Sequence, residues 1–374
     1  MLSLRSLLIP SMIWLATSPI SVAAQNPTPQ TPETACEKAA LWLAKQQEAD
    51  GSWVEKQQQK RGDLHQVGQT ALALMALESC GNRAAAGPYS ETVNRGISWL
   101  LRSQQSNGLF GGEVGNPTLY NHGLATLALV RLYQADGKPV TLKPILQDAL
   151  EVLVRARNPY AGWRYSLEPN GDNDASSTGF LLAVILNAHR AGLELDSSSL
   201  EGPWYWLESC IDKETGLTVY SPNGPKNMKS SASRERLLLE RFPTEYSEAL
   251  TSLALLNKWQ LDRQAILPMK QPWQAVLAKQ SQRLHQLLPV WQPQQGRVDL
   301  YFWYWASEAL QAYGGDAWQS WRRALQAALL PNQRRDGDLA GSWDPVGPWQ
   351  NSGGNRLYAT SLAIMALRNS VSQN

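Results

Sequence analysis

The sequence predicts an all-α protein in which six inner and six outer helices form a closed (α/α)6 toroid. Two observations lead to this prediction: a sequence repeat that recurs along the chain, and a strongly apolar helix after each copy of it. Repeats at a nearly constant spacing are typical of architectures built from stacked helix pairs. The chain has 374 residues, a length that repeat architectures reach as one unit, so we expect one domain over residues 34–370.

The repeat is clearest in residues 38–53, KAALWLAKQQEADGSW, and 95–110, RGISWLLRSQQSNGLF. Both segments carry Trp, Gln, Gly and an aromatic residue at the same offsets. Residues 149–163 and 323–343 are weaker copies, which end in Trp163 and Trp343. The Gly-x-aromatic end of each copy predicts a helix stop followed by a turn.

Six segments are apolar around their whole circumference, and such helices must be buried on every side. They are residues 69–79, 123–133, 178–189, 247–259, 302–313 and 358–368. The segments that precede them have one polar face and are expected to face solvent. These outer helices are expected near residues 34–46, 90–104, 142–156, 200–211, 272–287 and 318–330.

The N-terminus resembles a secretory signal, because Arg5 precedes an apolar stretch and small residues lead to a cleavage site after Ala24. We therefore expect a signal peptide over residues 1–24, a Pro/Thr-rich leader over 25–33, and a secreted or periplasmic protein. The alternative is an uncleaved membrane anchor, although the apolar stretch is short for a membrane span.

Export permits disulfides. Cys36 falls at the start of the first outer helix and Cys80 at the end of the first inner helix, and these ends meet in an antiparallel hairpin. The pair forms either a disulfide or two buried thiols.

Residues 213–243 interrupt the repeat spacing with an insert that is rich in Gly, Pro and Ser and basic over residues 226–241. It is either a solvated surface loop, or a lid or protein-docking segment over the mouth of the ring.

The first two copies resemble the repeats of squalene–hopene and oxidosqualene cyclases, which share their toroid with protein prenyltransferases. Residues 161–192 and 299–349 look like bacterial secreted proteins with prenyltransferase and squalene oxidase repeats. The resemblance implies a fold more than a reaction.

The prenyltransferase resemblance implies an Asp-x-Cys zinc pair and a Tyr-His pair. Here these sites read Asp299-Leu300-Tyr301 and Tyr358-Ala359, and one carboxylate cannot hold Zn²⁺. We expect no zinc prenyltransferase activity, no metal site and no cofactor.

The cyclase resemblance implies an Asp-x-Asp-Asp motif whose middle Asp protonates the substrate. Here the motif reads Asp172-Asn173-Asp174-Ala175, so the third carboxylate is missing. Asp174, with Asp172 beside it, is the candidate catalytic acid of a degenerate class II terpene cyclase. The simpler interpretation is an N-cap on an inner helix.

In a toroid the N-termini of the inner helices meet at one mouth, and polar and aromatic residues at these positions predict a ligand site. Aromatic residues of the adjoining turns are expected at its rim. The candidate ligand-binding residues are His65, Tyr120, His122, Trp163, Tyr165, Glu245, Tyr246, Asp299, Trp303, Trp343, Arg356 and Tyr358. Both histidines are either acid–base groups or hydrogen-bonded structural residues.

The main functional hypothesis is a toroid that binds a small-molecule ligand, such as a lipid or isoprenoid, in its central cavity. The alternatives are the degenerate cyclase and a glycan-active (α/α)6 enzyme, which needs two opposed carboxylates and aromatic platforms. The net charge of +2 gives no reason to expect nucleic acid as a partner.

Overall fold

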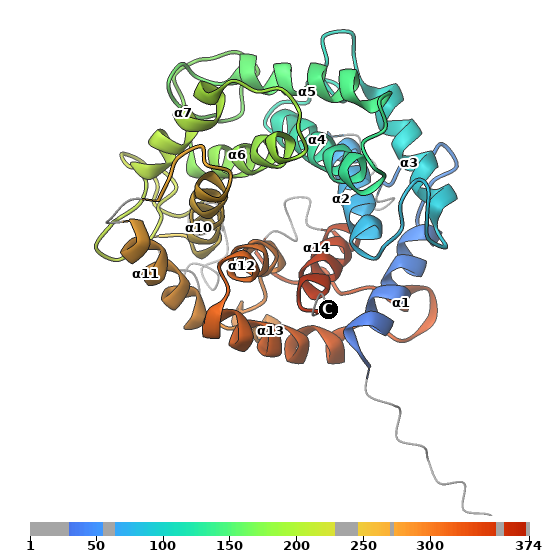
Figure 1. The fold of residues 1–374 in the computed structure, drawn as a ribbon. Helices are drawn as coiled ribbons and strands as arrows, with labels where there is room; N and C mark the ends of the chain where they lie inside the picture. The colour runs from blue at the N-terminus through green and yellow to red at the C-terminus, as the bar shows by residue number, and fades with distance from the viewer. Residues whose placement is uncertain (1–29, 55–63, 229–245, 270–272, 349–354, 372–374) are drawn as a thin grey trace, which may run out of the picture.

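The structure, a computed structural model, describes residues 30–54, 64–228, 246–269, 273–348 and 355–371. Over these residues it is an all-helical double ring, in which one layer of helices encircles another (Figure 1). No strand occurs in these ranges. The (α/α)6 toroid predicted from the sequence is confirmed.

The inner helices contain few charged residues and bury nearly all of their length. Apolar residues surround each of them, so they pack against both the outer layer and one another. The inner ring consists of α2 (Gln66–Ser79), α4 (Thr118–Ala135), α6 (Ala175–Arg190), α10 (Glu248–Arg263), α12 (Leu300–Tyr313) and α14 (Arg356–Asn369).

The outer helices bury one face and expose the other, as their polar stripes predict. The outer ring consists of α1 (Pro32–Lys45), α3 (Ser90–Ser103), α5 (Leu142–Ala156), α7 (Ser197–Glu208), α11 (Trp273–His285) and α13 (Gly315–Leu329). Short 3₁₀ turns lie at η3 (Pro293–Gln295), η4 (Leu330–Asn332) and η5 (Gly337–Leu339).

Several helices start before the segments predicted from the sequence, and two of these starts are instructive. The first helix begins at Pro32, because Thr31 caps it through a reciprocal capping box with Thr34 and Pro is tolerated in the first helical turn. Helix α4 begins at Thr118, about one turn before the apolar segment predicted from residue 123. The polar first turns of the inner helices are thus helical, and this places their side chains around the centre of the ring.

The tryptophan that ends a repeat copy is a packing residue. The indole nitrogens of Trp53, Trp163 and Trp343 donate to the carbonyl oxygens of Leu43, Leu153 and Leu329 at 2.8, 2.8 and 2.9 Å. The backbone N–H of the same tryptophans donates to a threonine hydroxyl on the next inner helix, and these threonines are Thr70, Thr178 and Thr360. Each tryptophan therefore joins an outer helix to an inner one.

The repeat glutamines join neighbouring outer helices. The side-chain amide of Gln47 donates to the carbonyl oxygen of Thr92 at 2.9 Å, and that of Gln104 donates to Ile145 at 3.0 Å. Gln333 makes the corresponding bond to the carbonyl oxygen of Ala35 at 2.8 Å and so connects the last repeat to the first. A ring closed in this way has no exposed end repeat.

The repeat glycines allow two backbones to meet. Gly341 has a φ of +96°, and a Cβ there would collide with the carbonyl group of Lys38. Gly51 has a φ of +98°, and its Cβ would lie 2.5 Å from the carbonyl oxygen of Arg95. Only glycine satisfies both the backbone angle and the close approach.

Cys36 and Cys80 lie together where α1 starts and α2 ends, as the hairpin predicts. Both are free thiols, and the Cys80 Sγ contacts the Cys36 carbonyl oxygen at 3.8 Å. Cys210 is free and buried.

Among the described helices, none is both long and apolar enough to cross a membrane. The proposed signal peptide and most of the leader lie outside the described residues.

Candidate functional site

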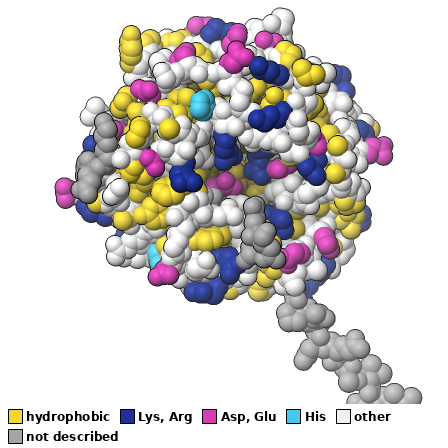
Figure 2. All heavy atoms as spheres, in the orientation of Figure 1, with side chains coloured by type: hydrophobic (Ala, Val, Ile, Leu, Met, Phe, Trp, Pro, Cys, Tyr) yellow, Lys and Arg dark blue, Asp and Glu magenta, His cyan; other side chains and the backbone are white. Residues whose placement is uncertain are grey.

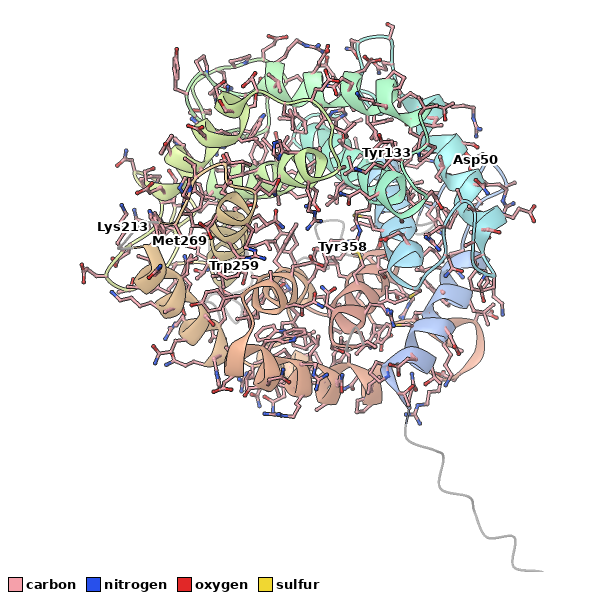
Figure 3. All side chains as sticks on the ribbon, viewed as in Figure 1. Asp50, Tyr133, Lys213, Trp259, Met269 and Tyr358 are labelled. Atoms are coloured by element: carbon pink, nitrogen blue, oxygen red, sulfur yellow. The ribbon has the colours of Figure 1, made fainter. Side chains whose placement is uncertain are left out.

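A cavity of about 570 Å³ lies among the first turns of the inner helices, within the size range of small-molecule sites. Helices α2, α4, α6, α12 and α14 contribute to its wall. Tyr358 on α14 is one of the lining residues, and Figure 3 shows it at the centre of the ring, whereas Asp50 and Lys213 lie near the periphery.

Tyrosine is the most frequent residue type on this wall. Six tyrosines line the cavity: Tyr120, Tyr165, Tyr220, Tyr301, Tyr304 and Tyr358. Tyr120 stacks on Phe180 with ring centroids 5.5 Å apart, and Phe180 meets the edge of Trp305 at 6.2 Å. Trp305 also packs on Tyr301 and Tyr304, so the rings form one continuous aromatic surface.

The remaining wall is apolar or neutral. Leu72, Met75 and Leu127 lie deeper along α2 and α4, and Met228 comes from the insert. No Asp, Glu, Lys or Arg is found among the described residues that line the cavity. Its polar side-chain atoms are therefore those of hydroxyls, amides, the Trp305 indole and the His65 imidazole, which suit a neutral ligand.

The described part of the insert is bound to the mouth of the ring. The N–H of Ala175 donates to the carbonyl oxygen of Tyr220, and Asn227 donates to that of Tyr246 at 2.7 Å. The N–H of Thr218 donates to the Thr251 hydroxyl, as the repeat tryptophans do elsewhere. This docking brings Tyr220 and Met228 into the cavity wall.

Asp174 lies behind the wall and caps α6. Its carboxylate accepts the Ser177 N–H at 2.7 Å and the Ser177 hydroxyl at 3.2 Å, and its side chain is fully buried. Burial raises the pKa of Asp174, and hydrogen bonds from Ser177 and the Tyr220 hydroxyl oppose the rise. The interpretation as an N-cap is confirmed, and the candidate acid does not line the cavity.

A second cleft of about 400 Å³ adjoins the cavity, and Tyr165 and Asn116 line both. This cleft is charged, because Glu113, Arg164 and Asp172 lie on it. Asp172 is largely exposed and lies 3.5 Å from Arg164, whose Nε lies 3.8 Å from Asp174. The two candidate acids therefore differ in environment, since Asp172 faces the outer cleft and Asp174 is buried.

A partly buried ion pair lies near the C-terminal ends of α2 and α4, where Arg131 contacts Glu78 at 2.7 Å. Burial raises the pKa of the neighbouring Tyr304, and hydrogen bonding to Arg131 opposes the rise. Figure 2 shows one face of the ring, with basic and acidic side chains gathered around its centre.

Four candidate ligand residues lie on the cavity wall: His65, Tyr120, Tyr165 and Tyr358. Burial lowers the pKa of His65, which favours a neutral imidazole. Burial raises the pKa of Tyr120 and Tyr358, so both remain protonated phenols.

His122 is a structural residue and does not line the cavity. It is fully buried, its Nδ1 accepts the Phe110 N–H at 3.1 Å, and its Nε2 lies 2.9 Å from the Ala149 carbonyl oxygen. Burial lowers its pKa to about 4. His122 thus occupies the place that a threonine takes in the repeats of α2, α6, α10 and α14.

Several other candidates also lie outside the cavity. The core contains Trp163, Trp303 and Trp343, which are at most 1% exposed. Asp299 caps α12 and accepts the Phe302 N–H at 3.1 Å.

Two further candidate ligand-binding residues contact other side chains away from the cavity. The Tyr246 hydroxyl accepts from Arg283 at 2.7 Å, and Arg356 pairs with Asp344 at 2.7 Å. Glu245 lies outside the described residues.

The cavity also contains residues that are not among the candidate ligand-binding residues given above. Tyr301, Tyr304 and Trp305 lie on one face of α12, and Trp303 lies on the opposite face. A helical period counted from the first turn finds this face, since residues three and four apart share one side. Tyr220 carried no such signal, because it lies in a non-helical segment.

Among the described residues, no group of three or more His, Cys, Asp or Glu side chains is placed to hold a metal ion.

Comparison with known proteins gives two kinds of similarity. The family model of the squalene-hopene cyclase C-terminal domain matches residues 15–122. No curated protein matches the sequence.

Among solved structures, the chain is similar to an inactive variant of the α-1,6-mannanase of Salegentibacter sp. HEL1_6 in complex with α-1,6-mannotriose. The identity is 12%, the TM-score 0.62, and the match covers 91% of this chain and 98% of that one. A family 76 glycoside hydrolase from Bacteroides thetaiotaomicron matches with 10% identity and a TM-score of 0.63, over 90% of this chain and 77% of that one.

The unsaturated glucuronyl hydrolase of Bacillus sp. GL1 matches with 12% identity and a TM-score of 0.59, over 90% and 96% of the two chains. At these identities the similarity shows a shared fold.

Proposed function

We propose that this toroid binds a neutral ligand with an apolar body, of the isoprenoid-lipid type, in its tyrosine-lined cavity. The observation that carries the proposal is a continuous aromatic wall without a charged side chain among the described lining residues. A charged ligand would lose its hydration there without gaining an ionic partner. An apolar ligand gains from burial against the rings, and a few hydroxyls remain to orient it.

The match of residues 15–122 to the squalene-hopene cyclase C-terminal domain supports an isoprenoid ligand. The test is equilibrium binding of the tritiated C20 alcohol geranylgeraniol to the purified protein. We expect saturable binding that is weakened by Phe180→Trp, because the larger side chain takes up space in the cavity beside Tyr120. Equal uptake by the wild type and this variant, with equal melting temperatures, contradicts the proposal.

A glycan-active enzyme is the second candidate. Its support is the similarity over nearly the whole chain to glycoside hydrolases, together with a charged cleft that presents Glu113 and Asp172 beside the ring of Tyr165. Glycoside hydrolysis needs two carboxylates across the scissile bond. Release of reducing sugar from α-1,6-mannan, lost in both Glu113→Gln and Asp172→Asn, would establish this function and displace the first proposal.

The cyclase alternative depends on Asp174, which is a helix cap behind Tyr220. If Asp174 donates a proton to a substrate, Asp174→Asn abolishes formation of cyclised product from squalene or shorter polyprenyl substrates. If Asp174 acts as a cap, the same variant changes the free energy of unfolding by about 1 kcal/mol or less.

Export remains a proposal that follows from residues 1–24. N-terminal sequencing of the protein from its own host tests it, because cleavage leaves a chain that begins at Gln25.

A further inference from the structure

The hydroxyl groups at the mouth of the cavity form a chain that ends on a buried carboxylate. The Tyr165 and Tyr220 hydroxyl oxygens lie 2.8 Å apart, and both residues line the cavity. The Tyr220 hydroxyl also has a hydrogen-bonding interaction with Asp174. The order is therefore Asp174, Tyr220, Tyr165 and then the cavity.

The chemistry of each group fixes the direction of these hydrogen bonds. A carboxylate only accepts, so Tyr220 donates its single proton to Asp174. The Tyr220 oxygen then accepts the proton of Tyr165 and also interacts with the Arg164 guanidinium. Tyr165 has no proton left, so its oxygen can only accept a hydrogen bond from a group in the cavity.

A second hydroxyl faces the cavity with the opposite polarity. Tyr120 lies 2.8 Å from Ser176 and donates to it, so the Ser176 proton remains available. Ser177 lies on the far side, where its hydroxyl donates to the Asp174 carboxylate at 3.2 Å. The mouth of the cavity thus offers an acceptor at Tyr165 and a donor at Ser176.

We propose that Tyr165, aligned by Tyr220 and Asp174, selects a ligand that carries an alcohol group over the matching ether or hydrocarbon. This inference rests on the proposed binding of a neutral apolar ligand and adds the identity of its polar end. An alcohol donates to Tyr165 and accepts from Ser176, whereas an ether only accepts and a hydrocarbon does neither. A ligand that displaces water from Tyr165 but has no donor leaves the Tyr165 oxygen without a hydrogen-bond partner. Such a ligand therefore binds more weakly than the alcohol.

The test compares the affinities of geranylgeraniol, its methyl ether and the corresponding C20 hydrocarbon for the full chain. In the wild type we expect the alcohol to bind about tenfold more tightly than the ether, as one neutral hydrogen bond predicts. In Tyr165→Phe the ratio falls to about one, while the affinity for the hydrocarbon stays the same. Tyr160→Phe is the matched control, because Tyr160 is 91% exposed and should leave the ratio unchanged.

The variant Asp174→Asn tests the donor-to-acceptor direction of the hydrogen bonds that run from Asp174 to Tyr165. The amide oxygen of Asn keeps the cap on Ser177, and its NH₂ group donates to Tyr220, so Tyr220 donates to Tyr165 and Tyr165 donates to the ligand. We expect this variant to bind the ether as tightly as the alcohol, or more tightly.

The outcomes distinguish a failure of the alcohol selection from a failure of the proposed apolar-ligand binding. If the wild type binds all three compounds with equal affinity, the alcohol selection is wrong and the apolar-ligand function stands. If Tyr165→Phe retains the preference for the alcohol, the Tyr165 hydroxyl does not contribute to that selectivity. If none of the three compounds binds, both proposals fall together.

Discussion

The side-chain amide of Gln333 donates to the carbonyl oxygen of Ala35 at 2.8 Å, across almost the whole length of the chain. The same amide also bonds to Gly341, so Gln333 joins its own turn to the first outer helix. We expect Gln333→Ala to lower the free energy of unfolding by about 1–3 kcal/mol, since it removes both of these buried hydrogen bonds.

Hydrogen exchange shows where this loss occurs. In Gln333→Ala the exchange rate should rise in α1, whereas in the matched variant Gln104→Ala it should rise in α5, where Ile145 loses its hydrogen bond from Gln104. Identical exchange patterns in the two variants would show that Gln333 has no particular part in closing the ring.

His122 should make the protein sensitive to mild acid. Its pKa in the folded chain is about 4, below the ordinary value of 6.5, so the unfolded state binds the proton more readily. Stability from this residue is fully present above pH 6.5 and is lost as pH falls toward 4, by about 3 kcal/mol in total.

The variant His122→Thr tests this, because threonine occupies the corresponding place in other repeats. Urea unfolding at several pH values between 7 and 4 should show a weaker pH dependence in the variant than in the wild type. His285→Gln serves as the control, and an unchanged pH dependence in His122→Thr would contradict the assignment.

Gly341→Ala should be strongly destabilising, by at least about 3 kcal/mol, because the new methyl group meets the Lys38 carbonyl at a positive φ. Gly81→Ala is the matched control. Gly81 has a φ of +82°, and a Cβ on it would meet no atom within 4 Å, so only backbone strain of about 1 kcal/mol is expected. Thermal melts of the two variants that coincide would argue against the close contact.

The thiols of Cys36 and Cys80 should join under a disulfide-exchange catalyst and an oxidant, and Cys210 should remain reduced. Cys36 and Cys80 are adjacent, whereas Cys210 is buried elsewhere and burial raises its pKa to about 12. Peptide mapping without reductant would show one cross-linked pair of peptides. A cross-link that involves Cys210, or none at all, contradicts the expectation.

The fold could be predicted from the sequence because its repeat and its helix periods are local signals. The cavity was harder to predict, since a helix that is apolar on every side does not reveal which face points to the centre. Trp303 and Tyr304 are neighbours in the chain, yet one is core and the other lines the cavity. Only the packing of α12 against α10 and α14 decides between them.

The role of His122 was hidden by the variable length of the turns. The turn residue that bonds to the inner helix precedes its partner by 17 residues at Trp53 and Thr70, but by 12 at Phe110 and His122. The equivalence of histidine and threonine is therefore visible in three dimensions and not in a fixed sequence spacing.

The contact between Cys36 and Cys80 also shows on which face of the ring the first helix begins. It places the start of α1 beside the end of α2, on the face opposite the first turns that hold the cavity. Figure 1 shows α1 at the outer edge of the ring. A bead or sensor surface coupled ahead of Thr31 would therefore attach to the ring on the face opposite the cavity and leave the cavity accessible to solution.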